Sequence, residues 1–113
     1  TYESFFTENF IKYKNKLNLK EMTHNAHIYN INMSSSNQRD IVIRKMKSFG
    51  ISTTFHYIPL HNSDAGKKYG RISGAMKVTE DMASRIVRLP LWIGVSVEEI
   101  TEAVSSWEKI YSQ

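Results

Sequence analysis

The sequence contains no cysteine, no long apolar run and no initiator methionine. Without cysteine the chain has no disulfide, no thiolate nucleophile and no cysteine-ligated zinc. No apolar run approaches the roughly 20 residues that a membrane-spanning helix needs, and no signal-peptide pattern is present. We therefore expect a cytoplasmic protein without membrane contact. The chain starts at Thr1 and runs at once into amphipathic periodicity, which we interpret as a cut inside a longer protein.

The composition indicates one small globular domain, residues 1–113. Hydrophobic residues make up 41% of the chain, which is too many for a disordered segment. Fifteen Lys and Arg residues face 11 Asp and Glu residues, so the formal net charge is +4. This modest surplus suits an anionic ligand but does not demand one.

Apolar periodicity and end signals predict a small two-layer α/β domain of the α+β kind, with one short sheet packed by helices. Ser36 or Asn37 is expected to cap the helix that Gly50 ends. Thr79 is expected to cap the next helix, and Ser96 and Glu99 should form a capping box at the start of the last helix. The two strands should be neighbours in the sheet, in an orientation that the pattern leaves open. The expected helices are 3–17, 37–49, 79–88 and 97–111, the strands are 27–33 and 51–57, and residues 61–77 form a loop with perhaps one helical turn.

The same periodicities predict the core. Alternation places Tyr29, Ile31 and Met33 on one face of the first strand, while Val42, Met46 and Phe49 share a face of the second helix. The buried stripe of the last helix is expected to contain Ile100, Ala103, Val104, Trp107, Ile110 and Tyr111.

The four histidines form two pairs, His24 with His27 and His56 with His61. Histidine is a common metal ligand, but these spacings match no regular metal motif and no cysteine assists. We predict that no metal is bound specifically.

A basic stretch, "GKKYGR" at 66–71, superficially resembles a phosphate-binding loop. It lacks the required spacing and the Ser or Thr after the lysine. Charge alone would let Lys67, Lys68, Arg71 and Lys77 meet a phosphate, but we interpret the stretch as a solvated loop. Aromatic residues are not interleaved with these bases, so we expect no nucleic-acid partner.

The stretch "HYIPLH" at 56–61 places His56, Tyr57 and His61 around Pro59 at the end of an expected strand. Side chains at strand ends reach clefts, and proline restricts the backbone there. Histidine exchanges protons near neutral pH, and tyrosine adds a hydroxyl. The residues alone leave two interpretations open, a binding cluster and a rigid turn with a buried Tyr57.

Three segments in this order, "NAHIYNINM", "GISTTFHYIPLH" and "ASRIVRLPL", resemble the C-terminal part of the DegT/DnrJ/EryC1/StrS nucleotide-sugar aminotransferases. The resemblance extends from about Phe10 to Tyr111. It implies fold type I, in which a large domain binds pyridoxal phosphate and a small C-terminal domain, here the chain itself, closes the cleft. None of the ten lysines lies in a motif like that of the family's Schiff-base lysine.

The resemblance further implies what the whole enzyme would do. An amino donor, expected to be glutamate, would supply nitrogen to a TDP-4-keto-6-deoxyhexose for surface polysaccharide biosynthesis. His56, Tyr57 and His61 would edge the sugar-nucleotide cleft of a homodimer, and no residue of this chain would be catalytic or hold the cofactor. The alternative is a free-standing, non-enzymatic module that binds a phosphorylated ligand through the basic loop.

Overall fold

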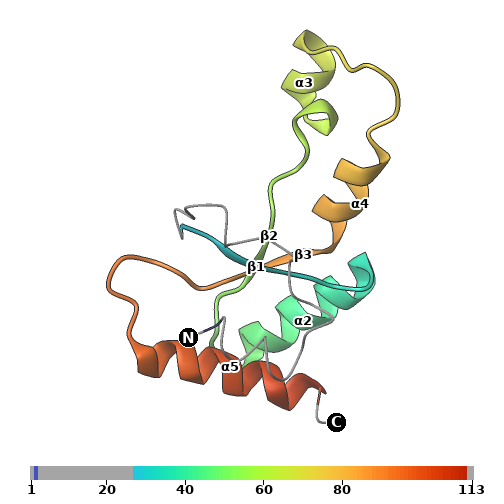
Figure 1. The fold of residues 1–113 in the computed structure, drawn as a ribbon. Coiled ribbons are helices and arrows are strands. Elements are labelled where there is room, and N and C mark those ends of the chain that lie inside the picture. Colours follow the sequence, from blue (N-terminus) through green and yellow to red (C-terminus); the bar gives the residue numbers. More distant parts are fainter. Residues whose placement is uncertain (1, 3–26, 112–113) are drawn as a thin grey trace, which may run out of the picture.

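A computed structural model describes Tyr2 and residues 27–111. Its elements follow one another along the chain as shown in Figure 1. The expected helix at 3–17 lies outside the described residues. The strands are β1 (Tyr29–Asn32), β2 (Thr54–Phe55) and β3 (Ile86–Leu89), and the helices are α2 (Ser36–Ser48), the 3-10 helix η2 (Leu60–Asn62), α3 (Asp64–Tyr69), α4 (Lys77–Arg85) and α5 (Val97–Tyr111).

The sheet has the order β1-β3-β2, and both pairings are antiparallel. Ile31 lies opposite Val87 on one side, and Phe55 lies opposite Val87 on the other. The sequence pattern had left the strand orientation open, and the structure shows that it is antiparallel. The two expected strands share this sheet, but the prediction that they are direct neighbours is wrong because β3 separates them.

The strand β3 falls where the sequence predicted the end of a helix, so the helix expected at 79–88 is wrong in its last three residues. Helix α4 ends at Arg85, and the chain continues extended. Val87 and Leu89 are buried on one side while Arg88 lies between them, which is the two-residue period of a strand. Pairing with a strand on each side stabilises this conformation over the local helical preference.

The helix ends were predicted with mixed success. The capping box of α5 is confirmed: the Glu99 backbone N–H donates to Ser96 Oγ at 3.1 Å, and the Ser96 N–H donates to Glu99 Oε2 at 2.8 Å. Ser35, one residue before the expected candidates, caps α2 by accepting from the Gln38 N–H. Helix α4 begins at Lys77 rather than after a Thr79 cap. Gly50, at φ 79°, adopts the left-handed conformation that the sequence predicted.

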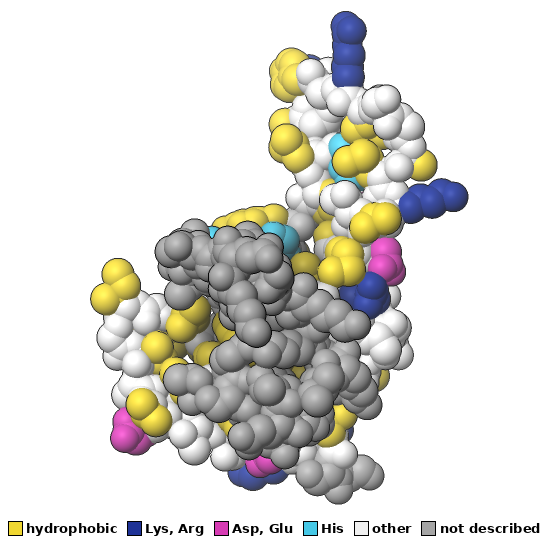
Figure 2. Space-filling view, in the orientation of Figure 1, with side chains coloured by type: hydrophobic (Ala, Val, Ile, Leu, Met, Phe, Trp, Pro, Cys, Tyr) yellow, Lys and Arg dark blue, Asp and Glu magenta, His cyan; other side chains and the backbone are white. Residues whose placement is uncertain are grey.

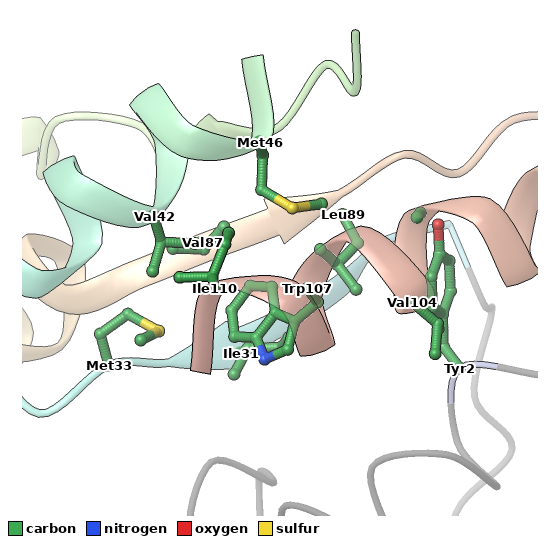
Figure 3. Close-up of a cluster of buried hydrophobic side chains, with 11 residues drawn as sticks. Tyr2, Ile31, Met33, Val42, Met46, Val87, Leu89, Val104, Trp107 and Ile110 are labelled. Carbon is green, nitrogen blue, oxygen red and sulfur yellow. The ribbon is translucent and has the colours of Figure 1, made fainter. Parts of the chain in front are cut away.

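The core lies between the sheet and the helices α2 and α5, which are on the same side of it (Figures 1 and 3). Trp107 and Met33 have no exposed surface. Phe49, expected on the buried face of α2, is 41% exposed, so that part of the core prediction is wrong. Tyr29, Ile100 and Tyr111, also expected in the core, are only partly buried and pack against the buried cluster. The cluster contains the other expected residues of three elements, with β3 added: Ile31, Met33, Val42, Met46, Val87, Leu89, Ala103, Val104, Trp107 and Ile110.

Tyr2 joins the core near the end of β3. Its ring stacks on Tyr29 with centroids 5.2 Å apart, and its hydroxyl donates to the Pro90 carbonyl at 3.0 Å. Burial, with a smaller contribution from the negative charge of Glu99, raises the pKa of Tyr2 to about 12.

Residues 58–76, here called the arm, leave the sheet after β2 and return at α4 (Figure 1). The sequence predicted a loop with perhaps one helical turn from 61 to 77, but the arm contains η2 and the six-residue helix α3. Figure 2 shows hydrophobic side chains gathered along this projecting part of the molecule. Within the described ranges, no helix combines the length and the apolar character needed to cross a lipid bilayer.

Candidate functional site

The "HYIPLH" stretch is held at the point where the sheet ends and the arm begins. Strand β2 pairs with β3 only through Thr54 and Phe55, so His56 and Tyr57 follow directly after the last paired residue. Pro59, at φ −51° and ψ 135°, turns the chain into η2. The sequence expected a strand through residue 57, but the chain has already left the sheet there, and this early departure frees the two side chains from sheet packing.

His56 and Tyr57 lie together at the surface. Their ring centroids are 5.4 Å apart with an edge-on angle of 63°. Tyr57 is 72% exposed, so the alternative of a rigid turn with a buried Tyr57 is wrong. The Tyr57 ring also meets the guanidinium of Arg88, whose Cζ lies 5.6 Å from the ring centroid. The Tyr57 ring therefore contacts β3 through Arg88, while most of its surface faces solvent.

A groove of about 480 Å³ runs beside this pair of rings, between the start of α2, the end of β2 and α4. It holds charged groups of both signs. The Arg39 guanidinium pairs with the Asp40 carboxylate at 2.7 Å. The residues that line it include Arg39, Asp40, Phe55, His56, Tyr57 and Glu80.

His61, the third predicted site residue, lies on η2 and faces a different hollow. Its side chain is 10% exposed, and its Nε2 atom is 3.1 Å from Glu80 Oε1. The Asn62 amide donates to the same carboxylate oxygen at 3.4 Å. This second hollow, of about 690 Å³, is formed by the arm with Leu60, Tyr69 and Ile72 among its lining. The structure thus brings His56 and Tyr57 together and separates His61 from them, with Glu80 between the two hollows.

Glu80 is a site residue that the sequence did not reveal. Its position near the start of a helix indicated only a favourable interaction with the helix dipole. The contact with His61 joins residues nineteen apart and depends on the path of the arm. Local pattern carries no signal for such a contact.

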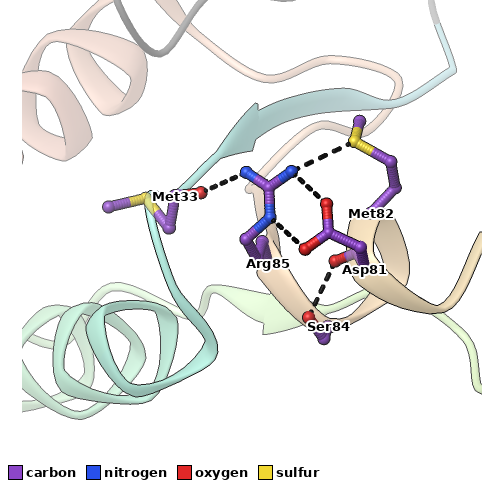
Figure 4. A network of polar contacts seen from close by, with 5 residues as sticks. All are labelled: Met33, Asp81, Met82, Ser84 and Arg85. Atoms are coloured by element: carbon purple, nitrogen blue, oxygen red, sulfur yellow. Dashed lines mark hydrogen bonds and ion pairs between the residues drawn. The ribbon is translucent and has the colours of Figure 1, made fainter. Parts of the chain in front are cut away.

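Arg85 fixes α4 to the end of β1 and so supports the wall of the groove (Figure 4). Its Nε donates to Asp81 Oδ1 at 3.0 Å and its Nη2 to Oδ2 at 2.5 Å, while its Nη1 donates to the Met33 carbonyl at 2.8 Å. The Met33 N–H in turn donates to the Arg85 carbonyl. Hydrogen bonding from the Arg85 guanidinium lowers the pKa of Asp81 below its ordinary value of 3.8.

Gly66 allows η2 and α3 to pack closely. A Cβ atom at this position would lie 1.7 Å from the Leu60 carbonyl oxygen, a distance that no side chain can occupy. The close approach of the two short helices, and with it the placement of His61, therefore requires glycine at position 66.

The basic residues of the arm, together with Lys77 at the start of α4, form no phosphate-binding loop. Lys67, Lys68, Arg71 and Lys77 are all exposed, and the Lys68 ammonium lies 5.1 Å from the centroid of its neighbour Tyr69. The sequence predicted a solvated loop: these residues are solvated, but Lys67 and Lys68 lie on helix α3 and Lys77 on α4. No group of three potential metal-ligating side chains occurs among the described residues. Because His24 lies outside them, the absence of a specific metal stays a prediction.

None of the described lysines offers a Schiff-base site for pyridoxal phosphate. Such a site needs a lysine shielded from water beside a pocket. Every described lysine is exposed, namely Lys45, Lys47, Lys67, Lys68, Lys77 and Lys109. The described part of the chain therefore contains no lysine that is shielded from water.

Comparison with known proteins identifies an aminotransferase family. The DegT/DnrJ/EryC1/StrS aminotransferase family matches residues 1–108. Among solved structures, a family member from Brucella abortus has 25% sequence identity and a TM-score of 0.64, with 76% of this chain and 22% of that chain covered. PseC of Helicobacter pylori, an aminotransferase involved in the biosynthesis of pseudoaminic acid, has 19% identity and a TM-score of 0.75, with 98% and 30% covered.

A proposed sugar aminotransferase of Streptococcus pneumoniae, in its PMP form, has 20% identity and a TM-score of 0.69. The alignment covers 98% of this chain and 28% of that one. The chain thus spans between 22% and 30% of the length of these three proteins.

Proposed function

The chain belongs to the DegT/DnrJ/EryC1/StrS aminotransferase family, and on this premise we propose that it is the small C-terminal domain of a pyridoxal-phosphate-dependent sugar-nucleotide transaminase. The family match over residues 1–108 carries this proposal. The small share of each related protein that the chain covers supports it, because it leaves room for a large domain elsewhere.

We further propose the reaction and its setting. The full-length enzyme would transfer an amino group, with glutamate as donor, to a TDP-4-keto-6-deoxyhexose for surface polysaccharide biosynthesis. The motif segments named above are similar to those of the TDP-4-oxo-6-deoxy-D-glucose transaminase, and this similarity supports the proposed substrate. The active enzyme would be a homodimer, with pyridoxal phosphate bound by the large domain and supplying the electron sink for nitrogen transfer.

In this proposal His56 and Tyr57 edge the sugar-nucleotide cleft. The exposed Tyr57 ring and the half-buried His56 ring both line a groove. This supports the assignment, because a side chain committed to the core is not available to a ligand. The Tyr57 hydroxyl would donate or accept a hydrogen bond at a sugar oxygen, and the His56 imidazole would do the same at a second position. These contacts orient the substrate and exclude water from it.

His61 would act differently from the other two. Its ring is turned toward Glu80, and only a tenth of the side chain is exposed. We therefore propose that His61 contributes by holding the arm against α4, with any direct contact to the substrate limited to its exposed edge. Among the three predicted residues, Tyr57 is the best placed to touch a ligand.

An amino-transfer assay tests this function. The full-length enzyme, incubated with TDP-4-keto-6-deoxyglucose and glutamate, should give the 4-amino sugar nucleotide and 2-oxoglutarate in equal amounts. The 113-residue chain alone should give neither, since every described lysine is exposed to water and an activated nucleophilic amine needs a desolvated or specially charged site. Turnover by the isolated chain would contradict the domain assignment, and an inactive full-length enzyme would contradict the substrate.

A further inference from the structure

Arg88 differs from the other half-buried arginines of the described chain. Arg39 is paired with Asp40, and Arg85 is paired with Asp81. No described carboxylate forms an ion pair with Arg88. Within the described residues, its guanidinium contacts the Tyr57 ring. A guanidinium that is partly removed from water without a counter-charge is costly. An anionic ligand would supply that charge.

The sheet places Arg88 on its outer face, away from the core. Val87 and Leu89, its neighbours on β3, are buried among the core side chains (Figure 3), so the side chain between them points to the opposite face. The register puts Asn30 of β1 and Thr54 of β2 directly opposite Arg88. Side chains opposite one another in antiparallel strands share a face. One row across the sheet therefore carries an amide, a guanidinium and a hydroxyl.

The contact with Tyr57 prepares Arg88 for a ligand. A guanidinium close to an aromatic ring is stabilised by the ring electrons and loses some of its freedom. Its N–H groups lie at the edge of the plane, and they remain available for two parallel hydrogen bonds to phosphate oxygens. The Thr54 hydroxyl, exposed on the adjacent strand, adds a further donor on the same face.

We propose that Arg88, together with Thr54 and the Tyr57 ring, forms a phosphate-binding site that receives the diphosphate of the sugar-nucleotide substrate. The identity of the ligand rests on the proposed function, because it is the sugar-nucleotide substrate that supplies a diphosphate. The contact between Arg88 and Tyr57 links this site to the cleft edge assigned above. A carboxylate of the amino donor has related chemistry, and the second experiment below distinguishes the two.

The first experiment uses the 113-residue chain and inorganic diphosphate. Resonances of the Arg88 Nε–H group and of the Tyr57 ring should shift and saturate in an NMR titration. Arg88→Met should weaken binding at least ~10-fold, as expected for losing a charge-assisted bidentate contact. Arg44→Met removes the same charge from an exposed position on α2 and should change the affinity less than twofold.

Equal losses of diphosphate affinity in Arg88→Met and Arg44→Met would show that diphosphate binds through net charge alone, and would overturn the site. Arg88→Lys guards against misfolding, because it keeps the charge and the long side chain but lacks the paired donors. It should fold as the wild type does and still bind several-fold more weakly. Wild-type affinity in Arg88→Lys would also overturn the site.

The second experiment uses the full-length enzyme and Arg88→Lys. The KM for the TDP-sugar should rise about 10-fold or more, while the KM for glutamate stays unchanged. A rise confined to glutamate would assign Arg88 to the donor carboxylate and overturn the diphosphate site. Unchanged values for both substrates would refute the site while leaving the proposed function intact. If the enzyme transfers no amino group, the proposed function fails, and the diphosphate titration still decides whether the site exists.

Discussion

His61 Nε2 lies 3.1 Å from Glu80 Oε1, and this contact joins the start of the arm to the first turns of α4. Asn62 donates to the same carboxylate oxygen, so two consecutive residues of η2 converge on Glu80. The arm is anchored here on one side, and at its other end it continues into α4. The position of the short helices relative to the groove with His56 and Tyr57 therefore depends on this carboxylate.

Glu80→Ala should loosen the arm without unfolding the domain. The Glu80 side chain is 48% exposed, so the loss in unfolding free energy should not exceed ~1 kcal/mol. Amide hydrogen exchange across residues 60–69 should nevertheless become faster, while exchange in α5 stays the same. Glu102→Ala, an exposed acidic position on α5, is the control. Unchanged exchange in the arm of Glu80→Ala would show that the contact holds nothing in place.

Gly66→Ala should disrupt the arm locally. Alanine normally favours a helix by about 1 kcal/mol over glycine, but here its Cβ would collide with the Leu60 carbonyl oxygen. We expect NMR resonances of η2 and α3 to shift or broaden while those of the core remain. Lys68→Ala, exposed on the same helix, should leave the spectrum near that of the wild type. An unperturbed arm in Gly66→Ala would mean that the two helices do not approach as described.

Trp107→Ala should cost ~3–5 kcal/mol in unfolding free energy, because it empties the centre of the core. The wild-type side chain has no exposed surface. A domain of this size has only ~5–15 kcal/mol in total, so the urea midpoint should fall sharply. Glu102→Ala on the same helix should change the unfolding free energy by less than ~0.5 kcal/mol. If the urea unfolding curves of wild type and Trp107→Ala coincide, the placement of Trp107 in the core is wrong.

The ion pair between Asp81 and Arg85 should make stability depend on pH in the acid range. The folded pKa of Asp81 is lowered, so its contribution is present above the ordinary pKa of 3.8 and is lost as the pH falls through the folded value. Asp81→Asn should therefore be less stable than wild type at pH 6, with a difference that shrinks below about pH 4. Urea melts of both proteins across this range provide the test. A difference that does not change with pH would contradict the pairing.

The sequence predicted those structural features that depend on residues close together in the chain. The capping box at Ser96, the left-handed Gly50 and the alternation around Ile31 are each determined by residues a few positions apart, and all three are present. Strand β3 was missed because it follows α4 without a break, so the helical pattern of the preceding residues was extended across it. Its conformation depends on partners more than thirty residues away, which the segment itself does not encode.

The candidate site was predictable to a smaller extent. Strand-end position and Pro59 indicated His56, Tyr57 and His61, and the first two do lie together beside a groove. The sequence did not reveal that His61 turns away to Glu80, or that Arg88 lies against Tyr57. Both contacts join segments that meet only after the arm and the sheet have formed.

Kinetics of three variants of the full-length enzyme test the central claim most directly. His56→Ala, Tyr57→Phe and His61→Ala should leave the cofactor spectrum nearly intact, because none of these residues is assigned to the cofactor. At least one variant should lower kcat/KM for the TDP-sugar, by an amount that corresponds to ~1–3 kcal/mol of activation free energy. This is the cost of losing a hydrogen bond to the bound substrate. If all three variants match the wild type in kcat/KM, the "HYIPLH" stretch is a structural turn, and the assignment of these residues to the sugar-nucleotide cleft is wrong.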